Sequence, residues 1–297
     1  MIVDLRYHVV TLVAVFLALG LGIIIGVNMG KTVNIQFEKQ IQRLEDTYVK
    51  IREDQKVLQA SLQSKENELN IANQFNRAIL PNLITNRLLG KRIAILRTNP
   101  SVDFKEVKQF VNMLRQAGAE VTSVTSFNKP IILDDNQLTT EIVDAFDLTM
   151  AENKELLHKV YQQIAQIIIN GQGSSQLIFL QNKELLQLWG DYNRGYVDTI
   201  IFWGGGNSPD TDFQKDLDLP LLDVFRKEKI VLIGVEPSFV TSTYMRLYQT
   251  KCLGTVDNVE TPQGQVALVY LLLSGKKGHY GVKDTARGLL PDFKVTY

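Results

Sequence analysis

The sequence predicts an α/β protein in which an N-terminal transmembrane helix and a coiled-coil stalk precede a doubly wound, mostly parallel α/β domain. Three observations predict this class: a long apolar run opens the chain, a heptad repeat follows it, and buried strands then alternate with amphipathic helices. Within the 297 residues we expect a short tail at 1–8, a transmembrane helix at 9–29, a stalk at 32–80 and the α/β domain at 90–297.

The composition is balanced in charge. Lys plus Arg and Asp plus Glu each number 32, so the formal net charge is zero, and nothing indicates the basic surplus of a nucleic-acid-binding protein. Hydrophobic residues make up 45% of the chain, which is enough for a folded core. The single cysteine, Cys252, excludes an intrachain disulfide and a cluster of thiolate metal ligands.

The first element is the uncharged stretch from Val9 to Met29. A helix that crosses a bilayer needs about 20 apolar residues, and this stretch has that length. The alternatives are a cleaved signal peptide and a buried core helix. A signal peptide has an apolar region of about 7–15 residues and a small-residue cleavage site, and a core helix has a polar face. The stretch lacks these features, so we expect a membrane anchor that is retained.

Small residues recur at every fourth position of this stretch and place a stripe along one helix face. Gly22 and Gly26 belong to two overlapping G-x-x-x-G patterns, which allow close approach of two helices in lipid. We therefore predict self-association through this face, with a chance pattern as the alternative. The Lys and Arg residues on the two sides of the span leave its orientation ambiguous. The stripe consists of Ala14, Ala18, Gly22, Gly26 and Gly30.

Heptad spacing then runs from Phe37 to Ile79 and predicts a coiled-coil stalk. Ten of the thirteen a and d positions are apolar, and no Gly or Pro occurs between Lys31 and Leu80. We expect Pro81 to end the helix and favour a parallel homodimer, with a helix packed on its own domain as the alternative. Such a stalk would be about 65 Å long. The apolar positions that carry this prediction most clearly are Ile41, Leu44, Ile51, Leu58, Leu62 and Leu69.

A strand–helix–strand pattern begins after Gly90 and implies a parallel sheet. Ser101 is expected to cap the first helix, and the stretch 129–150 is expected to be a surface excursion with at most a short helix. The expected strands are 91–97, 120–126, 176–180, 197–203 and 230–235, and the expected later helices are 153–169, 212–227 and 262–273.

In such folds, ligands bind at the carboxyl ends of the strands. The candidates there are Thr98 and Asn99, then Gly204, Gly205, Gly206 and Asn207, and finally Glu236 with Ser238. Backbone amides of a glycine loop can contact a phosphate or carboxylate. No G-x-G-x-x-G follows the first strand and no P-loop motif occurs, so a tight turn explains the three glycines equally well.

Catalytic and metal motifs are missing from the sequence. There is no G-x-S-x-G elbow, and His8, His158 and His279 form no ligand spacing with each other or with cysteine. The methionines are scattered, with no clustered pattern suited to Cu(I). We therefore expect no enzyme, no bound cofactor and no metal site built from local motifs.

The two ends of the chain resemble the MctB-type copper transporter family, also called the copper transport outer membrane protein family. The N-terminal match is LRYHVVTLVAVFLALGLGIIIG, and the C-terminal match runs from Thr255 to Pro291. The resemblance implies a single-pass protein of the cell membrane, with its α/β domain on the extracytoplasmic side and a role in copper transport or homeostasis at the cell envelope.

The same resemblance implies an alternative role. Some members of the family are linked to cell separation, as in the SteB-like partner of SteA, which influences septal peptidoglycan hydrolysis. The alternative is therefore a non-catalytic, membrane-tethered regulator of cell separation with a SteA-like envelope partner. A third reading, a ligand-binding or enzymatic α/β domain, would require a small molecule at Gly204–Asn207.

Overall fold

The computed structural model describes residues 5–207 and 213–292. Its chain divides into two compact units, residues 1–73 and residues 74–297. The first unit is formed by most of one long helix, and the second contains the end of that helix together with the α/β domain.

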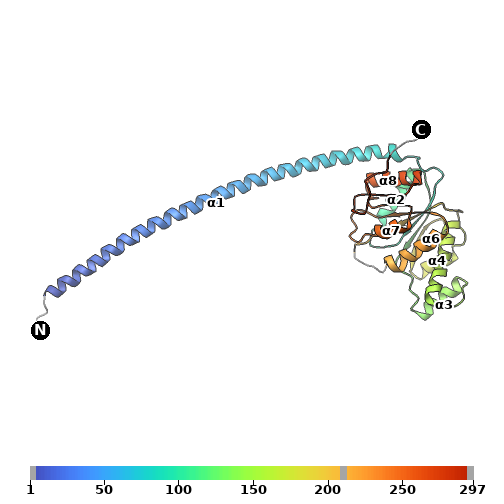
Figure 1. Cartoon of the computed structure of the whole chain (residues 1–297), viewed down its shortest axis with the longest axis horizontal. Coiled ribbons are helices and arrows are strands. Elements are labelled where there is room, and N and C mark those ends of the chain that lie inside the picture. Colours follow the sequence, from blue (N-terminus) through green and yellow to red (C-terminus); the bar gives the residue numbers. More distant parts are fainter. Residues whose placement is uncertain (1–4, 208–212, 293–297) are drawn as a thin grey trace. The chain divides into compact units, whose positions relative to one another are not determined.

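Helix α1 is a single helix of 80 residues, Leu5–Ile84 (Figure 1). Its segment Arg6–Val27 is long and apolar enough to cross a membrane, judged by length and composition. We expected Pro81 to end the helix, but the helix continues to Ile84. Proline removes its own N–H donor but keeps its carbonyl, and the Pro81 carbonyl accepts a hydrogen bond from the Thr85 amide at 2.9 Å.

The α/β domain is built on a sheet of seven described strands in the order β3-β2-β1-β4-β5-β6-β7. Every neighbouring pair is parallel except β2 and β3, so the sheet is mostly parallel, as predicted. The strands are β1 Arg92–Arg97, β2 Glu120–Phe127, β3 Leu186–Gly190, β4 Thr199–Trp203, β5 Val231–Val235, β6 Gly254–Val256 and β7 Gly278–Tyr280.

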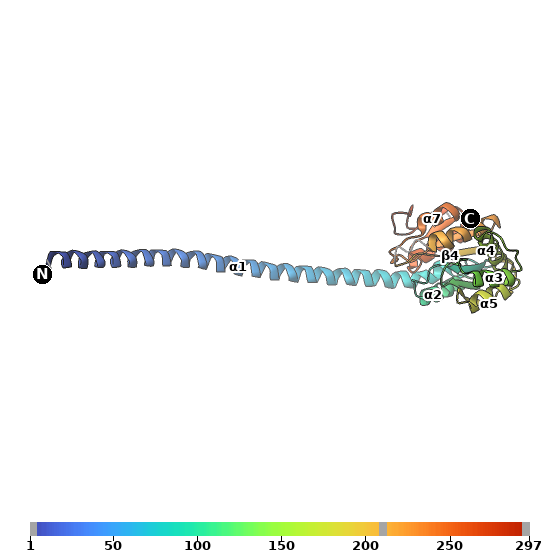
Figure 2. The same cartoon turned by 90° about the horizontal axis from the view of Figure 1, so that it is seen from below.

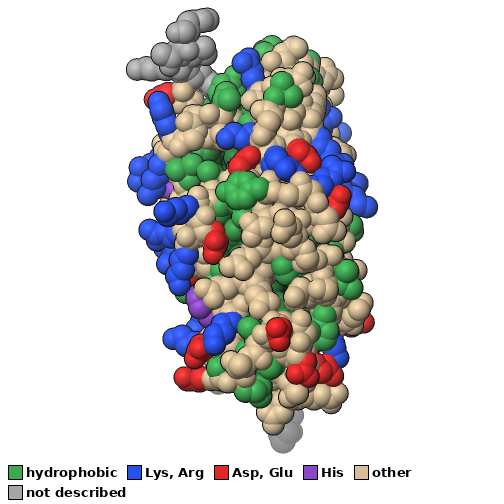
Figure 3. Space-filling model, turned by 90° about the vertical axis from the view of Figure 1, so that its right-hand side faces the viewer, with side chains coloured by type: hydrophobic (Ala, Val, Ile, Leu, Met, Phe, Trp, Pro, Cys, Tyr) green, Lys and Arg blue, Asp and Glu red, His purple; other side chains and the backbone are tan. Residues whose placement is uncertain are grey.

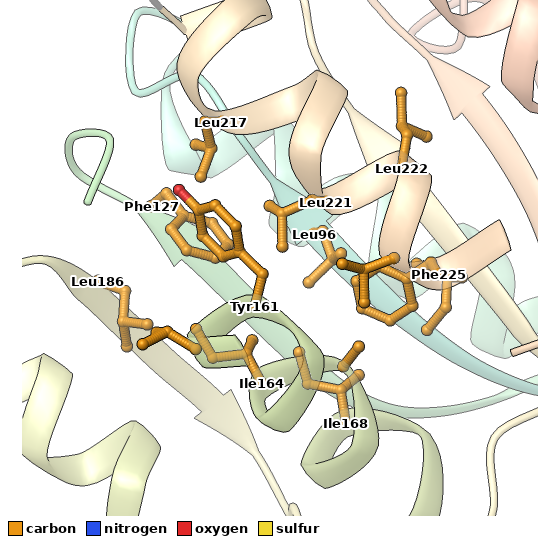
Figure 4. Packing of buried hydrophobic residues seen from close by; sticks show 14 of the residues in the cluster. Leu96, Phe127, Tyr161, Ile164, Ile168, Leu186, Leu217, Leu221, Leu222 and Phe225 are labelled. Carbon is orange, nitrogen blue, oxygen red and sulfur yellow. The ribbon is translucent and has the colours of Figure 1, made fainter. Parts of the chain in front are cut away.

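Helices cover both faces of this sheet (Figure 2). One face packs against α2, Phe104–Gln116, and α8, Pro262–Ser274, together with Ile84 at the end of α1. The other face packs against the remaining helices, and Figure 4 shows part of this core. Those helices are α3 Asn136–Ala145, α4 Asn153–Asn170, α5 Ser175–Asn182, the π-helical turn η1 Phe213–Asp218, α6 Leu219–Lys227 and α7 Met245–Lys251.

One predicted strand is wrong. Residues 176–180 belong to helix α5, and the neighbouring segment Leu186–Gly190 forms strand β3 instead. A short apolar run such as QLIFL has no periodicity that separates a strand from a buried helix turn. Leu177 and Leu180 lie three positions apart on the buried side of α5, which is the spacing of a helix face.

Three smaller expectations also need correction. Asp103, not Ser101, is the N-cap of α2, because its carboxylate accepts a hydrogen bond from the Lys105 amide at 2.9 Å. The stretch 129–150 contains α3 and contributes Ile142 and Phe146 to the core, so it is more than a surface excursion. The helix expected at 212–227 is η1 followed by α6, and residue 212 lies outside the described residues.

Candidate functional site at the carboxyl ends of the central strands

The sheet changes its winding direction between β1 and β4. The chain leaves β1 for α2 on one face, and it leaves β4 for η1 and α6 on the other face. This arrangement creates a topological switch point, where ligands of α/β proteins bind. The register continues past the strand ends: the Thr98 amide donates to the Trp203 carbonyl, and the Gly204 amide donates to the Val235 carbonyl, each at 3.0 Å. The residues after β1, β4 and β5 are therefore neighbours.

Asp218 is one of two acids at this edge that are completely buried. It ends η1 and has no exposed surface. Its Oδ1 accepts hydrogen bonds from the Thr98 hydroxyl, at 2.8 Å, and from the Tyr248 hydroxyl. Its Oδ2 has no hydrogen-bond partner among the described residues. Burial raises the pKa of Asp218 to about 7, because the charged form loses its hydration.

Glu236, directly after β5, is the second buried acid. Its carboxylate accepts hydrogen bonds from the Thr243 hydroxyl at 2.5 Å and from the Tyr244 amide at 2.8 Å, and it forms an ion pair with Lys283 at 2.6 Å. Burial raises the pKa of Glu236, although these partners act in the opposite direction. Asn99 completes the network, since its side-chain amide donates to the Tyr244 hydroxyl at 2.8 Å.

The C-terminal segment closes over the same edge of the sheet. Asp257, directly after β6, accepts hydrogen bonds from the Val282 amide at 2.7 Å and from the Lys283 amide at 3.3 Å. Beyond β7, Lys283 then reaches the carboxylate of Glu236. The segment 278–288 therefore contains the last strand and a loop that supplies the only cation found within 4.0 Å of Glu236 in the described part of the chain.

The predicted glycine loop lies at the switch point and is closely packed. A Cβ atom added to Gly204 would lie 2.1 Å from the Tyr248 hydroxyl, and one added to Gly206 would lie 2.5 Å from Asn99 Nδ2. Gly205 has a φ of +82°, which L-residues rarely adopt. Tight packing against the chain's own side chains therefore accounts for all three glycines. Binding of a ligand by Gly204–Asn207 stays a prediction.

Sequence reasoning located part of this network. It named Thr98, Asn99, Gly204–Gly206 and Glu236, and the structure brings these together. Asn207 is exposed, and Ser238 forms its hydrogen bonds with Glu260 instead. The residues missed are Asp218, Tyr244, Tyr248, Asp257 and Lys283.

The three histidines form no described hydrogen bond with the network residues, whereas Cys252 borders the network, because its backbone amide donates to the Tyr248 carbonyl at 2.7 Å. His279 is buried on β7 and His158 is half-buried on α4, while His8 is exposed on α1. Cys252 is a buried core residue between α7 and β6. Among the described residues, no group of three or more His, Cys, Asp or Glu side chains is arranged to hold a metal ion.

The residues predicted to mediate self-association all lie on α1. Apart from the neighbouring residues and backbone of the helix itself, no atom lies within 4 Å of a Cβ position on Gly22 or Gly26, and the surroundings of Gly30 are not described. The heptad residues are solvent-exposed in the single chain, with exposed fractions between 43% and 68%. We call these the heptad seam: Ile41, Leu44, Ile51, Leu58, Leu62 and Leu69.

Comparison with known proteins adds the following similarities. The family model described as "Copper transport outer membrane protein, MctB" matches residues 1–291. Proteins named "Copper transporter MctB" from Mycobacterium bovis and from two strains of Mycobacterium tuberculosis are 24% identical, over 94% of this chain and 96% of theirs. A solved structure, the TFIIH p34 N-terminal domain, is 13% identical with a TM-score of 0.28, covering 64% of this chain and all of that one.

Proposed function

Because the chain belongs to the family of copper transport outer membrane proteins, MctB, we propose that it is an envelope protein of copper homeostasis that acts by assembly and partner binding rather than by catalysis. The observation that carries the copper role is the family match, which extends from the membrane helix to the end of the α/β domain. The mycobacterial relatives named as copper transporters align along almost their whole length, which supports a role shared with the whole of those proteins rather than with one part.

The length and composition of α1 support assembly. A single apolar helix cannot enclose a path for an ion, so any passage through the membrane needs several chains or a partner. The heptad seam supports pairing, because leucine and isoleucine side chains at a and d positions gain about 1.5–3 kcal/mol each when they are fully buried. We propose a parallel homodimer, in which Gly22 and Gly26 face each other within the membrane.

Replacement of two seam residues should separate the dimer. In the variant Leu58→Asn with Leu62→Asn, two apolar side chains in each chain become polar, and we expect the dimer dissociation constant to rise at least about 100-fold. Light scattering of the full chain in detergent micelles measures this change. Val57→Asn is the matched control, because Val57 is also exposed but lies outside the a and d positions. If the double variant has the same molar mass as the wild-type dimer, the prediction that the heptad seam holds the dimer together is wrong.

We further propose that the α/β domain is extracytoplasmic, as the family resemblance implies. The only cysteine, Cys252, is buried, and burial raises the pKa of its thiol, so it should react slowly. A cysteine introduced at the exposed Lys129 should be labelled in intact cells by a membrane-impermeant maleimide, while the wild-type chain stays unlabelled. Labelling only after the cells are opened would place the domain in the cytoplasm.

A deletion strain, scored in two ways, tests the proposed function. Under copper stress we expect the strain to accumulate intracellular copper, with normal cell separation under the microscope. Chained cells with unchanged copper would overturn the copper role and favour the alternative, a SteB-like regulator of cell separation that acts with a SteA-like partner.

A further inference from the structure

A groove with an apolar floor lies outside the network described above. It runs between α4 on one side and η1 with α6 on the other, and it encloses a volume of about 870 Å³. Leu157 on α4 and Leu219 and Pro220 on α6 provide apolar lining and are each half-buried. Tyr161 closes the floor, with its ring in the core (Figure 4) and its hydroxyl donating to the Asp216 carbonyl at 3.2 Å.

The two walls of the groove are helix faces. On α4 the lining residues 154, 157, 158 and 161 follow the spacing of one helical face, and on η1 and α6 the residues 216, 219, 220, 223, 226 and 227 do the same. With Lys215, the second wall spans thirteen residues, 215–227, or about 18 Å of helix. A groove of this length and form accommodates about three turns of a third helix, which is a common mode of peptide recognition.

The rim of the groove carries an excess of positive charge. Four cations line it: Lys154, Lys215, Arg226 and Lys227. Within the described ranges, none of these four has a carboxylate within 4.0 Å. Two acids line the groove, and one of them, Asp223, is already paired with Lys251 at 2.6 Å. Asp216 is therefore the one lining acid left to offset the four cations.

This excess is a local property, because the chain as a whole has no net charge. The adjoining hollow, which shares Arg226 with the groove, adds Lys229 and Lys277 to this excess, while its third lysine, Lys251, is paired with Asp223. Figure 3 shows Lys and Arg side chains gathered in a column along one edge of the face that it draws. Unpaired cations on a surface favour a partner of opposite charge and increase its rate of association.

We infer that this groove binds an amphipathic, acidic helix of a partner protein. Apolar side chains of that helix would pack on Leu157, Leu219 and Pro220, and its Asp and Glu side chains would meet the four rim cations. The apolar floor favours a peptide helix over a polyanion, which would leave the floor uncovered. This inference is independent of the copper role, because it depends only on the shape and charge of the groove.

The experiment uses a defined probe and the full chain in nanodiscs of zwitterionic lipid. The probe is a fluorescent 18-residue helical peptide with leucines on one face and glutamates beside them. Three comparison probes are a twin with lysine in place of glutamate, a scrambled peptide of the same composition, and inorganic polyphosphate. The groove variant is Lys215→Glu with Lys227→Glu, and the matched control is Lys129→Glu with Lys276→Glu, two exposed lysines outside the groove.

We expect fluorescence anisotropy to show that the wild-type chain binds the acidic peptide at least about tenfold more tightly than the basic twin or the scrambled peptide. The groove variant should lose that preference and bind the basic twin more tightly than the wild type does, a gain that misfolding cannot produce. The control variant should change affinity less than about twofold.

Several results would overturn the inference. These are no binding of the acidic peptide at millimolar concentration, equal binding of the acidic and basic peptides, an unaffected groove variant, and displacement of the peptide by polyphosphate at equal charge concentration. A groove variant that changes the oligomeric state of the chain would also overturn it, because the occupant would then be a second copy.

Discussion

The variant Lys283→Met should lower the free energy of unfolding of the α/β domain by about 3–5 kcal/mol, the cost of removing one partner of a buried ion pair. Glu236 has no exposed surface, and Lys283 Nζ is the cation that lies 2.6 Å from its carboxylate. Because methionine keeps most of the side-chain volume of lysine, the loss of stability measures mainly the removal of the positive charge. Urea unfolding of the full chain in detergent micelles measures it, with the fluorescence of the two tryptophans, Trp189 and Trp203, as the signal.

Two further variants identify the cause of that loss. Lys276→Met removes an exposed lysine and should change the free energy of unfolding by less than about 0.5 kcal/mol. Glu236→Gln in the Lys283→Met background removes the uncompensated charge and should restore part of the stability. A loss below about 1 kcal/mol in Lys283→Met, or no recovery in the double variant, would contradict the assigned role of Lys283 in closing the C-terminal segment over the sheet.

The variant Asp218→Asn should remove a large part of the pH dependence of stability. Burial raises the pKa of Asp218 in the fold to about 7 from its ordinary value of 3.8, so between these two pH values the folded state binds a proton that the unfolded state has released. The contribution of Asp218 to the free energy of unfolding is therefore fully present below about pH 4 and is lost as the pH rises to 7. The loss is about 4 kcal/mol, from 1.36 kcal/mol per pKa unit.

Asparagine needs no proton to stay neutral, so the variant should lack this slope. Its side-chain oxygen can still accept hydrogen bonds from Thr98 and Tyr248. As the pH rises from 4 to 8, we expect the free energy of unfolding of the variant to increase by about 4 kcal/mol relative to that of the wild type. Asp144→Asn, on the exposed side of α3, is the matched control. Parallel pH profiles for Asp218→Asn and the wild type would show that the fold does not raise the pKa of Asp218.

The sequence predicted the parts of the fold that have strong local patterns. Strands β1, β4 and β5 are rich in buried aliphatic residues, β2 is rich in buried Val, Thr and Ser, and α4 and α8 have clear boundaries. Strand β3 was missed because an antiparallel edge strand is only partly buried, and its sequence LQLWG is short and mixed. The strands β6 and β7 have three residues each, too few to establish any periodicity.

Only those residues of the candidate site that directly follow a strand could be predicted from the sequence. The rule that ligands bind at strand carboxyl ends identifies Thr98, Asn99 and Glu236 from the sequence alone. Asp218 lies 120 positions from its partner Thr98, and Lys283 lies 47 positions from Glu236, so no local pattern joins them. One signal was present: Asp218 falls among Leu217, Leu219 and Leu221, where a buried carboxylate is unusual.

The central claim, that the chain acts in copper homeostasis through assembly on α1, can be tested by one measurement. Intracellular copper is determined under copper stress in the deletion strain carrying either the wild-type chain or the seam variant Leu58→Asn with Leu62→Asn, at equal amounts in the membrane. We predict that the wild-type chain restores low copper and that the seam variant leaves copper high. Restoration by a seam variant that light scattering shows to be monomeric would contradict the claim.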